Sequence, residues 1–552
     1  MAMESSNLPS SVEHSTLGGD AAVTTGAEAS RREETMEDAT TPCTKQDGGW
    51  WPSSATVATI FRPRGGAGPL MVGFVVLALL IIGARRWIDL DVLSSLQGKM
   101  TSTGPGQRRP PHHSDATAPL AEIPFTCGNE TSPQPTCPRS LPPTATLPRP
   151  GGLTSPPPSC PDYFRYIHED LRPWRGAGIT REAVERARPH AFFRLVVVGG
   201  RAYVETYRRA FQTRDVFTQW GVLQLLRRYA GRVPDLDVMF ACDDLGRVRA
   251  ADYPAPSDAP PVFRYCRDGS TLDILFPDWS FWGWPEVNIR PWPQLMEEVA
   301  RENQRVRWPE REPYAFWKGN PQMFHMRNEL MRCNVSNGQE WNARIFYQDW
   351  NEASRNGFKD SSIPKQCVYR YKVYVEGAAW SVSEKYILAC DSPVLFVTTP
   401  FQDILSRGLV AGKHYWPINR DHICKSIKVA VDWGNEHPAQ MQLIGEQGSR
   451  FMREEMSMDY IYDYMLHLLT EYTKLLRYKP TVPENAVEIC TESMACAAQG
   501  LHRECMMDSM ERHVAGFGPC TLPPPFTAKE AKEIADREAE LLRKVEKMEI
   551  AS

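Results

Sequence analysis

Hydrophobic and polar positions alternate between Tyr369 and Val397 in a way that predicts a strand, a helix and a second strand. Apolar residues of the first strand share one side at Tyr371, Val373 and Val375, and a Gly-Ala-Ala turn follows. The helix carries polar side chains: Ser381, Ser383, Glu384 and Lys385. Backbone N–H groups and the positive end of the helix dipole point outward where a strand feeds a helix. This β-α-β unit therefore predicts a site for a phosphate-bearing ligand.

The same patterning predicts further elements along the chain. Strands are expected on both sides of Gly199-Gly200 (193–204) and over 235–241. Helices are expected over 211–229, 295–306, 458–478 and 527–549, the last opening with a capping box of Thr527 and Glu530. Strands that alternate with helices are typical of an α/β protein with largely parallel sheets.

The N-terminal part of the sequence has a different composition. Residues 67–84 are uncharged, mostly apolar and flanked by arginines, which predicts a transmembrane helix; a buried core helix is the alternative. The preceding residues 1–66 are rich in Ser, Thr, Gly and Glu and predict a disordered cytosolic tail. Residues 85–158 are rich in Pro, Ser and Thr and predict an extended stem. The folded part begins near residue 159, and 481–552 form a C-terminal extension with a terminal helix.

Charge and cysteine content narrow the location and the partners. The net charge is −4 and there is no Lys/Arg-rich run, which argues against a nucleic-acid partner. Thirteen of the 14 cysteines follow the apolar span, as do two glycosylation sequons at Asn129 and Asn334. We therefore expect a single-pass type II protein of the Golgi or endoplasmic reticulum with a lumenal folded part. Cys127 and Cys137 either close a loop within the stem or pair elsewhere.

Two acidic pairs are candidates for chemistry. Asp243 and Asp244 follow a predicted apolar strand, where α/β sheets place their ligand crevice, and a carboxylate there can accept a proton from a hydroxyl. A turn-capping role is the alternative for both. Asp235 and Asp237 form a D-x-D pair whose carboxylates share one face of a strand, as a divalent-metal site requires. Pro234 precedes this pair and favours a strand-entry role instead.

Two further stretches suggest ligand contacts. An aromatic run around a glycine can stack on a sugar or a peptide, or it can pack in a core: Trp279, Ser280, Phe281, Trp282, Gly283, Trp284 and Pro285. A predicted strand ends in the turn Lys318, Gly319, Asn320, and Arg327 follows. Lys318 and Arg327 are possible cations for a phosphate.

In this order the segments resemble the CAP10 family of glycosyltransferases, which includes the Rumi-type protein O-glucosyltransferases. The matching pieces are CPDYFRYIHEDLRPW, PDLDVMFACDD, PDWSFWGWPEVN, YAFWKGN, YRYKVYVEGAAWSVSEKYILACDSPVLF, HYWPI and MDYIYDYMLHLLTEY. The segment AWSVSEKYILACDSP, the stem and the predicted anchor resemble the plant branch.

The resemblance implies a GT-B architecture with two Rossmann-like halves, an acceptor half over 159–310 and a donor half over 311–480. It implies inverting, metal-independent transfer of glucose or xylose from UDP-glucose or UDP-xylose to a hydroxyl of a protein or polysaccharide, with Asp244 as the base. It places acceptor contacts on Trp279 to Pro285. It places the donor site on Asn320, Arg327, Ala378, Ala379, Trp380, Ser381, Val382 and Ser383, and a disulfide between Cys367 and Cys390.

The chain departs from the family pattern at two points. Leu245-Gly246 follow Asp244 where relatives often have a proline two residues after the base, so Asp243 remains an alternative base. Ser383 stands where animal relatives carry an arginine, so the diphosphate charge must be met by Lys318, Arg327 or Lys385, or by the backbone. Two other readings therefore stay open: a metal-dependent transferase using Asp235 and Asp237, and an inactive relative that binds glycans or proteins.

Overall fold

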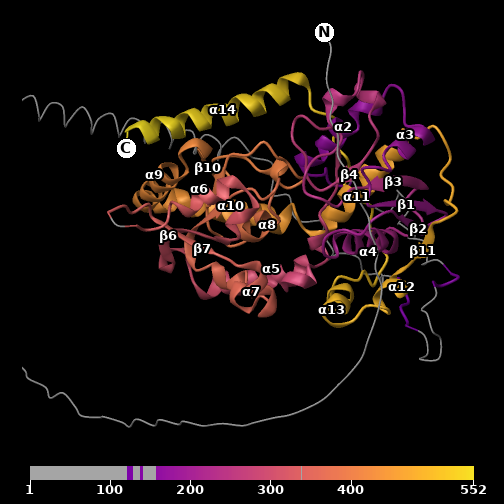
Figure 1. Cartoon of the computed structure of the whole chain (residues 1–552), viewed down its shortest axis with the longest axis horizontal. Coiled ribbons are helices and arrows are strands. Elements are labelled where there is room, and N and C mark those ends of the chain that lie inside the picture. Colours follow the sequence, from indigo (N-terminus) through magenta and orange to yellow (C-terminus); the bar gives the residue numbers. More distant parts are fainter. Residues whose placement is uncertain (1–120, 128–136, 141–156, 337, 552) are drawn as a thin grey trace, which may run out of the picture. The chain divides into compact units, whose positions relative to one another are not determined.

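A computed structural model describes residues 121–127, 137–140, 157–336 and 338–551 (Figure 1). The predicted tail (1–66), the predicted membrane helix (67–84), the sequon at Asn129 and most of the predicted stem lie outside these residues. Within the described ranges, none of the helices combines the length and the apolar character needed to cross a bilayer.

The first half of the described chain is built on a mixed sheet. Its strands lie in the order β11 (Val487–Ile489), β2 (Arg201–Thr206), β1 (Phe193–Val198), β3 (Leu236–Phe240), β4 (Phe263–Arg264) and β5 (Ile274–Leu275). The β3, β4 and β5 strands are parallel, whereas β1 is antiparallel to β2 and β3, and β11 is antiparallel to β2. The expectation of largely parallel sheets is therefore wrong for this half. The cause is local, because Gly199 (φ 56°) and Gly200 (φ 78°) form a two-residue hairpin turn, which is too short for a parallel crossover.

The second sheet is parallel between all neighbouring strands that the structure describes. Its order is β10 (Trp416–Ile418), β9 (Val394–Val397), β8 (Tyr369–Tyr374), β6 (Glu312–Gly319) and β7 (Ala343–Tyr347). The helix α8 (Ser383–Leu388) connects β8 to β9, which confirms the predicted β-α-β unit. The α6 helix (His325–Met331) lies between β6 and β7, and α7 (Trp350–Arg355) lies between β7 and β8, whereas α9 (Ile423–Glu436) follows β10. The two halves together are a mixed α/β structure consistent with Rossmann-like domains.

The longer predicted helices are present with shifted ends. They are α4 (Arg214–Arg228), α5 (Trp292–Arg305), α11 (Met458–Thr473) and α14 (Ala528–Ala551). The α4 helix begins three residues later than expected, because Gln212 has a left-handed backbone (φ 60°). The predicted capping box of α14 is present, since the Glu530 N–H donates to Thr527 Oγ1 at 3.2 Å and the Thr527 N–H donates to Glu530 Oε2 at 2.8 Å. The shorter or unpredicted helices are α2 (Tyr166–Asp170), α3 (Arg181–Arg186), α10 (Pro438–Glu454), α12 (Thr491–Ala495) and α13 (Gly500–Asp508).

C-terminal segments return to the first half of the structure. The α11 helix contacts α2 and α4 and buries Tyr460, Ile461 and Tyr462 in the core that contains β1 and β3 (Figure 1). The β11 strand extends the first sheet next to β2. The α11 helix and the β11 strand, which follow residue 310, are therefore packed with the first half.

Disulfides hold the described end of the predicted stem against this body. The described residues contain five disulfides: Cys127–Cys496, Cys137–Cys490, Cys160–Cys520, Cys333–Cys424 and Cys367–Cys390. The suggested Cys127–Cys137 pairing is wrong, because each of these two cysteines bonds to a C-terminal partner. Ile123 is also buried, and its N–H donates to the carbonyl of Arg512 at 2.8 Å. Residues 121–127 and 137–140 of the predicted stem are therefore attached to the folded body by these contacts. The Cys367–Cys390 pairing is as expected.

The described sequon residue lies close to one of these disulfides. Asn334 directly follows Cys333, and its Nδ2 donates to the carbonyl of Ile345 in β7 at 3.0 Å. An N-linked asparagine keeps one N–H on Nδ2, so this hydrogen bond is compatible with a glycan. Glycosylation at Asn334 stays a prediction.

Candidate active site

A cavity of 650 Å³ lies between the two sheets. Its walls come from residues that follow the carboxyl ends of strands: Asp244 after β3, Gly319 and Asn320 at the end of β6, Gln348 after β7 and Ala378 after β8. This is where α/β sheets place their ligands, and the volume is within the range of about 300–1,000 Å³ that small-molecule sites occupy.

Most of the predicted donor residues line this cavity, and few of the predicted acceptor residues do. The lining includes Asp244, Trp284, Lys318, Gly319, Asn320, Arg327, Ala378, Trp380, Ser381, Val382 and Ser383. The predicted site residues outside the lining are Trp279, Ser280, Phe281, Trp282, Gly283, Pro285, Ala379 and Lys385. The structure thus brings together the proposed base and the proposed donor residues.

The two neighbouring aspartates point to different surroundings. Asp244 lines the cavity with a side chain that is 32% exposed, and its Oδ1 accepts a hydrogen bond from Arg214 at 2.8 Å. Asp243 is not part of the lining and forms ion pairs with Arg247, at 2.5 Å, and with the fully buried Arg264. Of the two, only Asp244 is placed to meet a substrate.

The D-x-D pair is engaged by the protein itself. Asp237 is fully buried, and Arg194 donates to both of its oxygens at 2.7 Å, while Tyr478 donates to Oδ2 at 2.8 Å. Asp235 accepts the backbone N–H of Gly199 at 2.7 Å. These contacts support the strand-entry reading, because Arg194 already supplies the positive charge that the Asp237 carboxylate needs.

Another grouping of metal-ligand side chains lies outside the cavity lining. Cys160, His467 and Cys520 place one ligand-type atom each within 4.8 Å of one another. The two cysteines are joined in a disulfide, however, and a disulfide sulfur is not a thiolate ligand. The grouping therefore fits a covalent staple rather than a metal centre.

Arg327 connects the two turns of the donor side. Its guanidinium donates to the carbonyls of Glu376, at 2.9 Å, and Asn320, at 3.2 Å, and to Ser381 Oγ at 3.3 Å. Burial lowers its pKa to about 10, which still leaves the guanidinium charged at neutral pH. It forms no ion pair with any carboxylate of the described residues. The nearby Glu376 carboxylate favours its charged form but forms its direct ion pair with Arg420, at 3.2 Å, rather than with Arg327.

The turn after β8 is shaped for this contact. The Gly377 N–H donates to the carbonyl of Trp380 at 3.1 Å, and a Cβ atom at Gly377 would lie only 2.8 Å from that carbonyl oxygen and 3.4 Å from Arg327. Glycine is therefore required for the close approach. Ser381 Oγ and Ser383 Oγ lie 2.8 Å apart, so both hydroxyls and Arg327 form one polar group.

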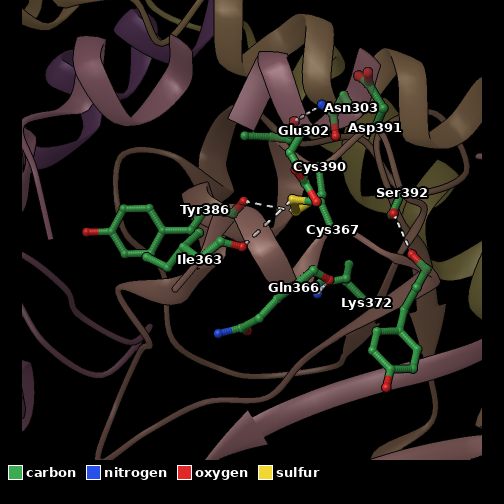
Figure 2. Close-up of a disulfide and its surroundings, with 12 residues drawn as sticks. Glu302, Asn303, Ile363, Gln366, Cys367, Lys372, Tyr386, Cys390, Asp391 and Ser392 are labelled. Carbon is green, nitrogen blue, oxygen red and sulfur yellow. Dashed lines mark hydrogen bonds between the residues drawn. A yellow bond between two sulfur atoms is a disulfide. The ribbon is translucent and has the colours of Figure 1, made fainter. Parts of the chain in front are cut away.

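Two lysines also line the cavity. Lys318 Nζ donates to the carbonyl of Asp360 at 2.7 Å. Lys372 is buried in β8, where its Nζ donates to the carbonyl of Gln366 beside the Cys367–Cys390 disulfide (Figure 2). Burial, reinforced by the nearby charge of Arg311, lowers the pKa of Lys372 well below its usual range. Neither lysine forms an ion pair within the described part of the chain.

Lys385 and most of the aromatic run have a structural role. Lys385 Nζ is buried and forms an ion pair with Asp278 at 2.8 Å, so it links α8 to the first half and does not reach the cavity. Trp279 and Trp282 are fully buried, and Trp282 Nε1 donates to Tyr462 at 3.0 Å. Of this run, only Trp284 lines the cavity.

Several lining residues were missed from the sequence. They include Phe211, whose side chain is 69% exposed, and the basic residues Arg214, Arg290, Lys359 and Lys372. In total six basic and two acidic residues line the cavity, which makes it a site for an anion. The sequence gives no clear sign of Lys372, because its strand, YRYKVY, contains a second basic residue, Arg370. Nothing local distinguishes Arg214, because it is the first residue of an ordinary helix.

Two α/β halves with a cation-rich cavity at the carboxyl ends of their strands are typical of an enzyme that handles a nucleotide-linked substrate. The chain belongs to glycosyl transferase family 90, whose sequence profile matches residues 155–549. The resemblance to CAP10 glycosyltransferases is thereby confirmed.

Relatives with a named activity agree with this assignment. The chain is 25% identical to protein O-glucosyltransferase 1 of Homo sapiens over 342 residues, which are 58% of this chain and 82% of the relative. It is 26% identical to the Bos taurus protein of the same name over 341 residues, covering 59% and 83%. It is 24% identical to O-glucosyltransferase rumi of Drosophila melanogaster over 335 residues, covering 58% and 78%. The protein is therefore a glycosyltransferase by family.

Proposed function

We propose that this protein is an inverting transferase that moves glucose or xylose from UDP-glucose or UDP-xylose to a hydroxyl of a protein or polysaccharide. We further propose that residues 67–84 anchor it in the membrane of the Golgi or endoplasmic reticulum, with the catalytic part in the lumen. The names of the relatives support a glucosyl donor, and the disulfides support an oxidising compartment.

The observation that carries the proposal is a group of basic side chains opposite a carboxylate, none of which forms an ion pair within the described residues. Arg327, Lys318 and Lys372 line one cavity, and all of their hydrogen bonds within the described residues go to carbonyl or hydroxyl oxygens. A diphosphate would supply the missing negative charge in charge-assisted hydrogen bonds. Asp244 lies in the same cavity, where a general base for an acceptor hydroxyl is needed.

The proposed reaction is a single displacement. Asp244 removes the proton of the acceptor hydroxyl while the oxygen forms a bond to the anomeric carbon. The bond between that carbon and the diphosphate oxygen breaks, and UDP leaves with the electron pair. Arg327 and the Ser381 and Ser383 hydroxyls stabilise the departing charge. Because these groups are contributed by the protein, we expect the reaction to proceed without a metal ion.

The acceptor would approach from the side of the first half. Trp284 is the part of the aromatic run that lines the cavity, and its Nε1 is held by Gln212 Oε1 at 2.9 Å. Its ring lies 6.2 Å from that of Trp350, which belongs to the second half. An acceptor sugar or peptide that stacks on these rings would be placed next to Asp244.

The test is UDP release by the full-length protein over a panel of UDP-sugars, with and without Asp244→Asn. A positioned base is worth about 10² to 10⁴ in rate, so the variant should lose transfer by that factor and keep UDP affinity within about twofold. Asp243→Asn is the matched control and should leave transfer unchanged. Full transfer by Asp244→Asn would remove this residue from the role. Absence of UDP binding by the folded wild type would instead favour a binding protein without catalysis.

A further inference from the structure

Arg214 holds the carboxylate of Asp244 from one side. It is the first residue of α4 and is nine-tenths buried, and its Nη1 donates to Asp244 Oδ1 at 2.8 Å and to the carbonyl of Cys242 at 3.4 Å. Its guanidinium lies 4.6 Å from the centroid of the buried Trp279 ring. The ring and the strand end thus fix the guanidinium, and the guanidinium fixes the carboxylate.

The contact is one-sided. Oδ1 of Asp244 is taken by Arg214, whereas Oδ2 accepts no hydrogen bond from any residue in the described ranges. Asp243, by contrast, is paired by two arginines and lies outside the cavity. A carboxylate with one oxygen anchored and the other open presents a single oxygen in a fixed direction.

We propose that Arg214 is a positioning residue for the transfer reaction, acting through Asp244. This inference rests on the proposed function. With Oδ1 held by Arg214, Oδ2 receives the proton of the acceptor hydroxyl as the oxygen bonds to the anomeric carbon and UDP departs with its electron pair. Arg214 itself exchanges no proton. Its contribution is to orient the base. A misplacement of a catalytic group by about 1 Å can lower the rate by about 10²-fold.

The experiment measures kcat, the donor KM and UDP affinity for full-length Arg214→Ala, Arg214→Lys and the wild type. We expect Arg214→Ala to lower kcat by about 10²-fold, while the donor KM and the dissociation constant for UDP stay within about twofold. Millimolar guanidinium, far below denaturing concentrations, should restore part of kcat by refilling the vacated space. A purely structural role would not be rescued in this way.

Arg247→Ala is the matched control, since it removes the same kind of ion pair from Asp243 and should leave kcat unchanged. Unchanged kcat in Arg214→Ala overturns the inference, as does a loss that extends equally to UDP affinity and resists guanidinium. If Arg214→Ala does not fold, the kcat of Arg214→Lys tests the inference instead. Lysine keeps the positive charge but cannot reproduce the planar, forked hydrogen-bonding geometry of the guanidinium. A fall of about 10-fold in its kcat supports the role, and wild-type kcat overturns it. A wild type that transfers no sugar overturns the proposed function, and this inference with it.

Discussion

Replacing Arg327 by glutamine tests how the protein meets the charge of a diphosphate. Relatives are expected to use an arginine at the position of Ser383, which this chain lacks. Arg327 reaches the same polar group from α6, since its guanidinium lies 3.3 Å from Ser381 Oγ, and Ser381 lies 2.8 Å from Ser383. Glutamine keeps a hydrogen-bond donor in this place but removes the charge.

The size of the effect follows from the contacts. Hydrogen bonds to charged groups contribute about 1.5–3 kcal/mol each, and Arg327 has no carboxylate partner in the described residues that would share it. Losing one such bond to a phosphate oxygen should weaken UDP binding by about 10- to 150-fold. The glutamine variant also leaves the Asn320 or the Glu376 carbonyl without its donor, which should lower stability by about 1–3 kcal/mol.

Isothermal titration with UDP and with uridine distinguishes the loss of the Arg327 charge from general damage to the binding site. Uridine lacks the phosphates, so its affinity should stay within about twofold in Arg327→Gln. Lys318→Gln is a matched control on the same cavity. The hydrogen bond of Lys318 is exposed, whereas those of Arg327 are partly buried, so loss of Lys318 should weaken UDP binding by no more than about fivefold. Equal losses for UDP and uridine, or an unchanged UDP affinity, would refute the assignment of Arg327 as the diphosphate cation.

Two further predictions concern stability. Burial, with a smaller effect of Lys413, lowers the pKa of His414 from an ordinary value of 6.5 to about 3. The stability that the neutral imidazole contributes is therefore fully present above pH 6.5 and is lost as the pH falls toward 3. Between pH 7 and pH 5 this should cost about 2 kcal/mol in urea unfolding, and His414→Asn should flatten that slope; an identical slope would contradict the reasoning. Lys385→Met strands the buried Asp278 carboxylate and should cost about 3–5 kcal/mol, part of which Lys385→Met with Asp278→Ser should recover. A single-variant loss below about 1 kcal/mol would show that the pair does not join the halves as described.

The predictable parts of this chain were those encoded by local periodicity. The β-α-β unit at 369–397 and the glycine hairpin at 193–206 follow from alternation and from residues that permit positive φ. The capping box at Thr527 is likewise a short-range pattern. Each of these features depends on residues only a few positions apart, so a single sequence is enough to predict them.

Contacts between residues far apart in the sequence were harder to predict. Cys127 bonds to a cysteine 369 positions away, and no local pattern distinguishes that partner from the nearby Cys137. The burial of the aromatic run could not be predicted for a related reason, because the sequence shows that Trp279 and Trp282 are large but not what covers them. Gly221 in α4 leaves room for Trp282, since a Cβ there would lie 2.6 Å from that ring. Burial of this kind is decided by packing across the fold.

The site takes its residues from two parts of the chain, and its location in the fold explains why. Carboxyl ends of β3 and of β6 and β8 belong to different sheets, yet they open onto one cavity. In the proposed mechanism the base follows a strand of one sheet, whereas Arg327 and Lys318 belong to the half built on the other. The proton-accepting and charge-stabilising tasks would then fall on different halves, so each could be altered without the other. That separation predicts opposite signatures: Asp244→Asn should reduce kcat and spare UDP affinity, whereas Arg327→Gln should reduce UDP affinity first. If the two variants affected both quantities equally, the halves would not divide the reaction in the way this cavity implies.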